Sequence, residues 1–258
     1  MTPKLRLDEP ADGVARLTID NPERRGALDH ELLDALATYA RTLDARCLVI
    51  RGSGNVFSAG YDIGNLEGQS FEESAERLVA HPFHDALEAL EAYRYPVVGE
   101  INGHAIGGGL ELALTCDIRV AARTARFAMP PAKLGLIYSH TGLRKFIDVC
   151  GPANTAELFH VGEAVDADRA LTMGLVNEAV DPDRLEGRVL EMARQIAANA
   201  PLSLAGNKRI IRTLRTQPLP PEVEQELIEL RESCFRSEDF REGVRAFAEK
   251  RTPRWQGR

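Results

Sequence analysis

The stretch IGGGLELALTCD, residues 106–117, places three consecutive glycines ahead of an apolar run with helical spacing. This pattern predicts a helix that begins near Gly108. The first backbone N–H groups of a helix have no acceptor within it, and the helix dipole favours negative charge there. Glycine also lacks a Cβ, so a bound molecule can approach the backbone closely. The stretch predicts an anion-binding helix start, with a flexible turn as the alternative for the glycines alone.

A second glycine junction lies upstream, in the stretch FSAGYD at residues 57–62. It follows an apolar run at residues 47–50 that predicts a buried strand. Residues 96–101 predict another buried strand, which leads toward the three glycines. The spacing of a phosphate-binding loop is absent, because no Gly-Lys-Ser or Gly-Lys-Thr follows them. Two strands that each deliver a glycine junction favour a binding or catalytic site over two unrelated turns.

Strand and helix signals alternate in the first half of the chain and give way to helices afterwards. Strands are predicted at residues 14–19, 47–50, 96–101, 117–122 and 125–129, and helices at residues 28–43 and 71–93. Beyond about residue 140 the strand signals almost vanish, and helices are predicted at residues 164–173, 185–198, 202–214, 223–236 and 240–247. This order predicts an α/β core in residues 1–198. Residues 199–258 are predicted to form a helical region that packs on the core or on a neighbouring subunit.

The composition is that of an acidic protein of 258 residues, with 32 Lys and Arg against 39 Asp and Glu and a net charge of −7. This balance argues against a nucleic-acid-binding protein, which needs a basic surface. No apolar run approaches the ~18 residues of a membrane span, and residues 1–6 lack the apolar core of a signal peptide. The four cysteines, Cys47, Cys116, Cys150 and Cys234, form no Cys-x-x-Cys pair. We therefore expect reduced thiols in a cytoplasmic protein.

Motifs spread over nearly the whole chain resemble those of the enoyl-CoA hydratase/isomerase family, the crotonase superfamily. They occupy residues 21–23, 57–63, 101–109, 116–118, 170–177, 237–243 and 247–251. The resemblance implies an α/β fold, a crotonase-like spiral of ββα units with a C-terminal α-helical trimerisation region. It also implies an acyl-CoA substrate, no cofactor beyond that CoA thioester, and a homotrimer or a hexamer built as a dimer of trimers.

The resemblance assigns the thioester oxygen to two backbone N–H groups, which by motif position belong to Tyr61 and Gly108. Such donors stabilise the negative charge of an enolate as it develops. The Tyr61 ring then either contacts the acyl group or only packs. The residues that the resemblance places in contact with substrate or CoA are Arg24, Arg25, Ala27, Ala59, Tyr61, Asp62, Ile63, Gly107, Gly108, Pro131 and Lys250.

The basic members of that set are expected to meet the charged end of CoA. Arg24 and Arg25 match the loop with which the family contacts the nucleotide, and Lys250 and Arg251 match its C-terminal basic pair. In the family this pair reaches the CoA phosphates, sometimes across a subunit boundary. A cation beside a phosphate is physically sensible, although surface Lys and Arg side chains are usually only solvated.

Hydratases of this family use two glutamates, and the sequence retains the first of them. That glutamate matches Glu111, whereas Pro131 occupies the position of the second. Hydration of a double bond needs a base for the water and an acid for the α-carbon. The stretch FAMPPAKLGLIY at residues 127–138 instead resembles the methylmalonyl-CoA decarboxylase branch of the family. That branch keeps the first glutamate, lacks the second and carries a tyrosine at the position of Tyr138.

We therefore expect a lyase that decarboxylates a malonyl-type, methylmalonyl-like CoA thioester, with Glu111, Tyr138, Tyr61 and Gly108 as catalytic residues. Loss of CO2 leaves an enolate, which is the charge that paired N–H donors stabilise. Tyr138 would orient the departing carboxylate or reprotonate the α-carbon. Glu111 would hydrogen-bond within the site or act as the acid.

Other functions stay open from the sequence. One is an enoyl-CoA hydratase or isomerase with Glu111 as its sole carboxylate, and another is a non-catalytic scaffold that binds acyl-CoA. Ser139 and His140 suggest a thioester hydrolase site beside Glu111, although hydrogen bonds that cap a turn near residues 141–142 are the simpler role for them.

The remaining polar residues of interest fit structural roles better than catalysis. Asp62 and Asp117 suit capping or packing, and His104 stands where the family commonly has an aromatic ring. No metal site is expected, because the other histidines considered show no ligand spacing; these are His81, His84 and His160.

Overall fold

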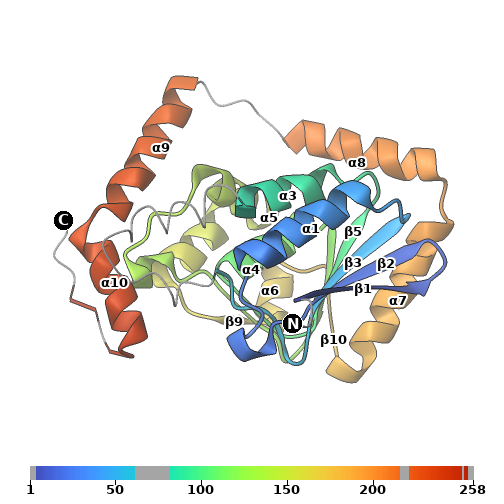
Figure 1. Ribbon diagram of the computed structural model, residues 1–258, viewed down its shortest axis with the longest axis horizontal. Coiled ribbons are helices and arrows are strands. Elements are labelled where there is room, and N and C mark those ends of the chain that lie inside the picture. Colours follow the sequence, from blue (N-terminus) through green and yellow to red (C-terminus); the bar gives the residue numbers. More distant parts are fainter. Residues whose placement is uncertain (1–3, 62–81, 216–220, 252, 255–258) are drawn as a thin grey trace.

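The computed structural model describes residues 4–61, 82–215, 221–251 and 253–254 (Figure 1). The strands are β1 Leu5–Ala11, β2 Val14–Ile19, β3 Cys47–Gly52, β4 Val56–Ser58, β5 Val97–Ile101, β6 His104–Ile106, β7 Ile118–Ala122, β8 Arg126–Ala128, β9 Val165–Asp166 and β10 Glu178–Val180. The helices are η1 Pro22–Arg24, α1 His30–Thr42, α3 Pro82–Ala92, α4 Gly108–Thr115, η3 Pro131–Leu134, α5 His140–Ala156, η4 Glu157–Val161, α6 Ala167–Met173, α7 Pro182–Ala198, α8 Pro201–Arg215, α9 Pro221–Phe235 and α10 Glu238–Ala248.

Successive strands join two different sheets. The larger sheet has the order β1-β2-β3-β5-β7-β10, and the smaller has the order β4-β6-β8-β9. The pairs β3 and β4, β5 and β6, and β7 and β8 each give one strand to each sheet. Neighbours pair in parallel from β2 through β10 and from β4 through β8, whereas β1 and β9 pair antiparallel at the edges. This repetition is the predicted crotonase-like spiral of ββα units.

The alternation of side chains along the strands creates two cores, one on each face of the larger sheet. In β3, Cys47 and Val49 face α7 and pack in one cluster, while Leu48 and Ile50 belong to the larger cluster on the other face. A strand with apolar side chains on both faces is typical of a parallel sheet covered by helices on both sides. Figure 1 shows α1 and α7 on opposite sides of this sheet.

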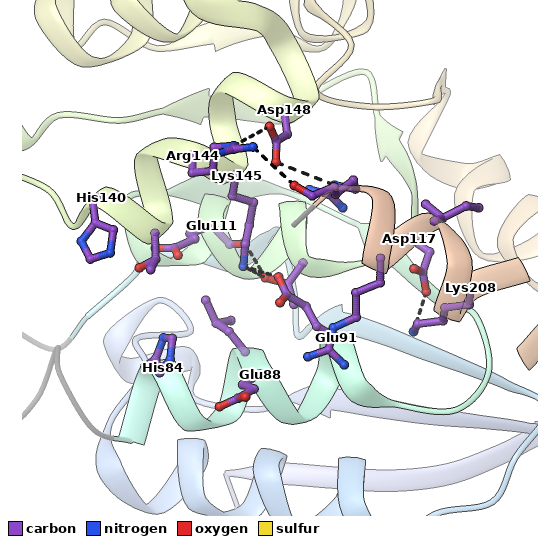
Figure 2. A pocket seen from close by; sticks show the side chains of 16 residues that line it. His84, Glu88, Glu91, Glu111, Asp117, His140, Arg144, Lys145, Asp148 and Lys208 are labelled. Carbon is purple, nitrogen blue, oxygen red and sulfur yellow. Dashed lines mark hydrogen bonds and ion pairs between the residues drawn. The ribbon is translucent and has the colours of Figure 1, made fainter. Parts of the chain in front are cut away.

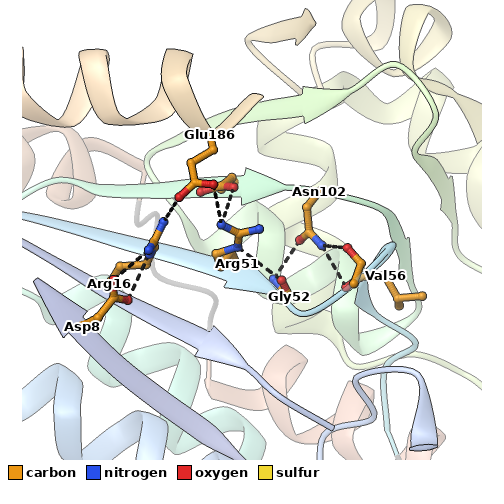
Figure 3. Close-up of polar contacts among 9 residues, drawn as sticks. Asp8, Arg16, Arg51, Gly52, Val56, Asn102 and Glu186 are labelled. Carbon is orange, nitrogen blue, oxygen red and sulfur yellow. Dashed lines mark hydrogen bonds and ion pairs between the residues drawn. The ribbon is translucent and has the colours of Figure 1, made fainter. Parts of the chain in front are cut away.

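Polar side chains hold the ends of the strands from which the chain passes from the larger sheet into the smaller sheet. The Asn102 side chain accepts a hydrogen bond from the Gly52 N–H and donates one to the Gly54 carbonyl, both at 2.8 Å. At the other end of this network, Arg16 bonds Asp8 and Glu186 and so ties α7 to β1 and β2 (Figure 3). These contacts hold β3 beside β5 and therefore set where β4 and β6 begin.

Although strand signals almost vanish after residue 140, the structure has two short strands there. The short strand β9 pairs with β8, and β10 extends the larger sheet beside β7. Two or three residues carry too little periodicity to be recognised, and their pairing depends on strands far away in the sequence. The long helix α5 was also not predicted. The helix predicted at residues 71–93 is α3 where the structure describes it, and residues 62–81 lie outside the described residues.

The three C-terminal helices lie at two separate places on the core. Figure 1 shows α8 at one end of the molecule and α9 and α10 at the other. Helix α10 packs so closely on η3 that a Cβ on Gly243 would lie 2.0 Å from the Leu134 carbonyl oxygen. The division of the chain at residue 198 stays a prediction. None of the helices in the described ranges combines the length and the apolar character needed to cross a bilayer.

Candidate active site

The two glycine junctions meet at the end of β4 and the start of α4. A Cβ on Gly60 would lie 2.7 Å from the Ile106 carbonyl oxygen and 3.0 Å from the Gly108 nitrogen. A Cβ on Gly109 would lie 2.3 Å from the Ser58 carbonyl oxygen. Only glycine fits both positions, since contacts under 3.0 Å to backbone atoms cannot be relieved by moving a side chain. These contacts bring Tyr61, which follows Gly60, beside Gly108.

The start of α4 is fixed by its glycine N-cap. Gly107 has a φ of +56°, a value that L side chains rarely adopt, and its N–H donates to the Ala128 carbonyl at 2.9 Å. Its carbonyl oxygen accepts from the N–H groups of Leu110 and Glu111. The helix therefore begins at Gly108, whose N–H, like the first N–H of any helix, has no acceptor within the helix.

The Glu111 carboxylate lies one turn into α4 and is buried. The Tyr138 hydroxyl donates a hydrogen bond to its Oε2 atom. Burial raises the pKa of Glu111, and the charge of Lys145 and this hydrogen bond oppose that rise. Burial also raises the pKa of Tyr138 well above its ordinary value, and the neighbouring Glu111 charge raises it further. The Tyr138 phenol therefore keeps its proton at neutral pH and donates a hydrogen bond to the Glu111 carboxyl group.

Tyr138 is held in place by the residues around its ring. The ring lies edge-to-face with Phe159, with centroids 5.4 Å apart. A Cβ on Gly142 would lie 2.5 Å from this ring, so the first turn of α5 leaves just enough room for it. Ser139 caps α5 by accepting the Gly142 N–H at 3.1 Å. The capping role weighed for Ser139 is thus what the structure shows.

Tyr61 lies between the start of α4 and this pair. A Cβ on Gly108 would lie 3.1 Å from the Tyr61 ring, and the ring packs edge-to-face on Phe83 at 4.6 Å. A hydrogen bond with Tyr61 is among the causes that raise the pKa of Tyr138. The Tyr61 ring therefore packs and also faces the polar groups of the site. The structure places the four predicted catalytic residues together.

A cavity of about 500 Å³ opens beside Glu111, between α3, α4, α5 and α8 (Figure 2). Its wall is mostly charged, and Leu87 and Ile211 are the aliphatic members. Ion pairs cross or border it at Lys145–Glu91, Lys208–Asp117 and Arg144–Asp148. The full lining is His84, Leu87, Glu88, Glu91, Glu111, Thr115, Asp117, His140, Thr141, Arg144, Lys145, Asp148, Lys208, Ile211, Arg212 and Arg215.

Several residues of this wall were not singled out from the sequence. Lys145, Glu91 and Thr115 line the same cavity as Glu111, but they come from three helices. Thr115 offered a local signal, because it follows Glu111 by four residues and so shares its helix face. Nothing local shows that Lys145 and Glu91 return to the same place.

Pro131 lies where the resemblance places the second glutamate of hydratases. It opens η3, and its carbonyl oxygen accepts the Leu136 N–H at 2.9 Å. Its side chain has no group that titrates or donates.

The predicted CoA-binding loop runs beside the first glycine junction. The Arg25 carbonyl oxygen accepts the Ala59 N–H at 3.0 Å, and the Leu28 N–H donates to the Gly60 carbonyl at 2.8 Å. Arg24 and Arg25 are exposed, whereas Ala27 is buried. Asp62 and Ile63 lie outside the described residues.

At the C-terminal end, Lys250 is exposed with a φ of +53°. Arg251 bonds Glu242 at 2.6 Å and also bonds Glu249, so its guanidinium fastens α10. Arg251, one member of the predicted basic pair, therefore has a structural role in the contacts of α10. Lys250 stays the predicted CoA contact.

Of the other polar residues considered from the sequence, Asp117 forms structural contacts, and His104 and His140 lie at the surface or in the cavity wall. Asp117 accepts the Val97 N–H at 2.7 Å and pairs with Lys208. His104 is exposed on β6, and His140 lines the cavity. Within the described ranges, no group of three or more His, Cys, Asp or Glu side chains has the arrangement of a metal site.

Comparisons with known proteins agree on one family. A family model described as enoyl-CoA hydratase/isomerase matches residues 9–258. The chain is 33% identical over 252 residues to a probable enoyl-CoA hydratase of Bacillus subtilis, covering 95% of both proteins. It is 33% identical over 269 residues to a carnitinyl-CoA dehydratase of Salmonella arizonae, covering 100% of both. The solved structure of methylmalonyl-CoA decarboxylase in complex with 2-nitronate-propionyl-CoA aligns with a TM-score of 0.89, at 27% identity over 99% of both chains.

Proposed function

The chain belongs to the enoyl-CoA hydratase/isomerase family, a superfamily of acyl-CoA-transforming enzymes, and we propose that it is a lyase that decarboxylates a malonyl-type CoA thioester. One observation carries this proposal. The buried carboxylate of Glu111 accepts a hydrogen bond from the Tyr138 phenol, while Pro131 occupies the position of the second carboxylate. Of the two positions that hold the carboxylate pair of hydratases, Glu111 thus keeps its carboxylate, Pro131 has none, and the phenol beside Glu111 is a proton donor.

Decarboxylation mainly requires stabilisation of the negative charge that forms on the thioester oxygen. The bond between the carboxylate carbon and the α-carbon breaks, CO2 leaves, and the electron pair moves through the α-carbon to the thioester oxygen. The N–H groups of Tyr61 and Gly108 then face an enolate oxygen whose charge is largest near the transition state. The thioester carbonyl is itself the electron sink, so we propose that no metal or organic cofactor takes part.

A proton must then reach the α-carbon, and we assign it to the Tyr138 hydroxyl. The phenol carries the proton in the resting site, and Glu111 orients it. Transfer of this proton leaves a phenolate beside an ionised carboxylate, which is unfavourable in a buried site. A proton from solvent must therefore return through the polar cavity that borders Glu111. The burial of the site also keeps the substrate carboxylate poorly hydrated, which favours loss of CO2.

Hydration is the second candidate, and a specific observation favours it. The relatives at 33% identity are named enoyl-CoA hydratase and carnitinyl-CoA dehydratase, whereas the decarboxylase structure is 27% identical. In this alternative Glu111 is the sole carboxylate, and Tyr138 replaces the missing glutamate in proton transfer. The non-catalytic scaffold is the third candidate.

A direct assay separates the three candidates. The purified protein is incubated with malonyl-, methylmalonyl- and ethylmalonyl-CoA, and in parallel with crotonyl- and carnitinyl-CoA, while CO2 and the acyl-CoA products are followed. We expect CO2 release from at least one malonyl-type thioester. Turnover confined to crotonyl- or carnitinyl-CoA would support hydration, and the absence of any turnover would support the scaffold.

The basic residues are proposed to hold the charged end of CoA. Arg24 and Arg25 are exposed on the loop that runs beside Ala59, and Lys250 is exposed beyond α10. Cations bind phosphates at such positions without a rigid pocket. Replacing both Arg24 and Arg25 by alanine is expected to raise the KM for acyl-CoA with little change in kcat. An unchanged KM would remove this assignment.

A further inference from the structure

Lys145 reaches from α5 into the interior between α3 and α4, where a lysine is unusual. Its side chain is only 10% exposed, and its Nζ lies 2.8 Å from Glu91 Oε1. It also donates to Thr115 Oγ1 at 2.8 Å. Ammonium groups are rarely buried unless partners compensate for the lost water. Glu91 and Thr115 therefore hold Lys145 in a defined position in the wall of the cavity that Glu111 also lines.

Thr115 extends this contact to the helix that carries Glu111. Its hydroxyl accepts from Lys145 and donates to the Glu111 backbone carbonyl at 3.0 Å. Figure 2 shows Lys145 beside Glu111, with Glu91 on the neighbouring helix. The ammonium thus approaches the catalytic turn of α4 from the side opposite the glycine junction.

The charged and titratable groups around Glu111 come from every element that packs on α4. Tyr138 precedes α5, Lys145 lies on α5, Tyr61 follows β4, and His84 and Glu91 lie on α3. His140 faces the same cavity from the start of α5, and His104 on β6 is exposed. Lys145 is the strongest of the influences that favour the charged form of Glu111, whereas burial and Glu91 oppose it.

We propose that Lys145 is a positioning residue, whose ammonium, held by Glu91 and Thr115 on the wall of the same cavity, favours the charged form of Glu111 as the acceptor for the Tyr138 hydroxyl. The consequence for turnover rests on the proposed function, but the ionisation state of Glu111 does not. A neutral Glu111 would carry its own proton and compete with the phenol as donor. Tyr138 would then lose the partner that fixes its orientation.

The proposal gives opposite signs for two neighbouring substitutions. Burial already raises the pKa of Glu111, so removal of the Lys145 charge raises it further. Removal of the Glu91 charge lowers the pKa of Glu111, since a like charge disappears. Glu111 is ionised above its pKa, and the acidic limb of the pH–kcat profile follows it. Lys145→Met therefore moves this limb to higher pH, and Glu91→Gln moves it to lower pH.

The experiment compares Lys145→Met, Lys145→Arg and Glu91→Gln with the parent protein. Infrared spectra recorded over a pH series report the protonated carboxyl of Glu111, assigned by its loss in Glu111→Gln. We expect the midpoint to rise by about one pH unit in Lys145→Met and to fall in Glu91→Gln. Lys145→Arg keeps the positive charge and is expected to stay near the parent value. The pH–kcat profiles with the best substrate are expected to shift in the same directions.

Two outcomes would overturn the proposal. Shifts of the same sign in Lys145→Met and Glu91→Gln would show that the ion pair only braces α3 against α5, and unchanged midpoints would show that Lys145 does not influence Glu111. If Lys145→Met fails to fold, the sign of the Glu91→Gln shift together with the Lys145→Arg midpoint decides. The infrared titration uses no substrate, so a protein that turns over no acyl-CoA yet shows opposite shifts refutes the proposed function alone.

Discussion

The Tyr138 hydroxyl is the single group on which the proposed chemistry depends most. It points its proton at Glu111 within a buried site, and its ring is fixed by Phe159 and by the missing side chain of Gly142. The raised pKa of Tyr138 keeps the phenol protonated at neutral pH. A proton held in this way is available to a carbanion but is not lost to solvent.

Tyr138→Phe removes that proton and leaves the shape of the site. We expect kcat for the best malonyl-type substrate to fall by about 10²–10⁴-fold, as for loss of a general acid, with a small change in KM. Tyr93→Phe is the matched control. The Tyr93 hydroxyl donates a hydrogen bond of 2.6 Å to the Ala45 carbonyl, and this contact is not part of the glycine junctions. This control is expected to cost about 1 kcal/mol of stability and to keep its kcat. Similar kcat values in both variants would exclude Tyr138 as the proton donor.

The chain after β4 and the start of α4 pack backbone against backbone. A side chain at either glycine would overlap the backbone of the other segment. Ser58 and Gly109 touch at the backbone, and Gly60 lies against Ile106. The glycine contacts therefore set the spacing of the Tyr61 and Gly108 N–H groups. Oxyanion donors need such fixed positions to act without reorganisation.

Gly109→Ala tests this close approach. The new methyl group would lie 2.3 Å from the Ser58 carbonyl oxygen, so the two elements must separate. We expect a loss of about 1–3 kcal/mol in the free energy of unfolding and a loss of kcat larger than that stability change explains. Gly187→Ala is the control, since a Cβ there meets nothing within 4 Å in the exposed part of α7. It is expected to raise stability by about 0.5–1 kcal/mol. Equal behaviour of the two variants would contradict this account.

Helix α10 is fastened to the chain that follows it through one carboxylate. Glu242 accepts from Arg245 and Arg251 and, at 2.9 Å, from the Arg254 N–H. These hydrogen bonds hold the pKa of Glu242 well below its ordinary value of 4.5. A depressed pKa gives stability that is present above the unfolded value and is lost as the pH falls toward the folded value.

Glu242→Gln is therefore expected to lower the thermal midpoint at pH 7 and to differ less from the parent protein as the pH falls below about 4. Glu238→Gln is the matched control on the same helix, because Glu238 forms an exposed pair with Arg241 at 3.1 Å. Exposed pairs contribute little, so this control is expected to follow the parent protein across the pH range. The measurement is thermal unfolding by circular dichroism over a pH series. A gap between Glu242→Gln and the parent that widens in acid would reverse the assignment.

The sequence predicted those parts of the fold that depend on local periodicity or on glycine. It placed β2, β3, β5, β7 and α4 correctly, because alternating or continuous apolar residues mark the strands and three glycines precede the apolar run of α4. It missed β1, although Asp12 and Gly13 form the two-residue connection that is the usual hairpin signal. The strands β9 and β10 could not be found, since they exist only by pairing with β8 and β7.

The residues of the site likewise fall into those with a local sequence motif and those that only the packing of distant elements brings together. The family motifs placed Tyr61, Gly108, Glu111 and Tyr138 in one site, and the structure brings them together. The motifs did not indicate Lys145, because its contacts with Thr115 and Glu91 depend on the packing of α5 against α4 and α3. Charge contacts between separate helices leave no periodic trace in the sequence.

The remaining prediction concerns assembly, which the family resemblance implies as a homotrimer or a dimer of trimers. Helix α8 leaves Leu202 79% exposed and Ile210 57% exposed, beyond the core that α7 covers. Aliphatic side chains gathered on one helix are typical of a surface that another chain covers. We expect light scattering during size-exclusion chromatography to give the mass of a trimer or hexamer. Leu202→Glu with Ile210→Glu is expected to lower that mass, whereas Leu171→Glu on α6, where Leu171 is 41% exposed, is expected to leave it unchanged. A parent protein that elutes as a monomer would show that α8 serves no trimer, and the polar cavity between α5 and α8 would then be complete within one chain.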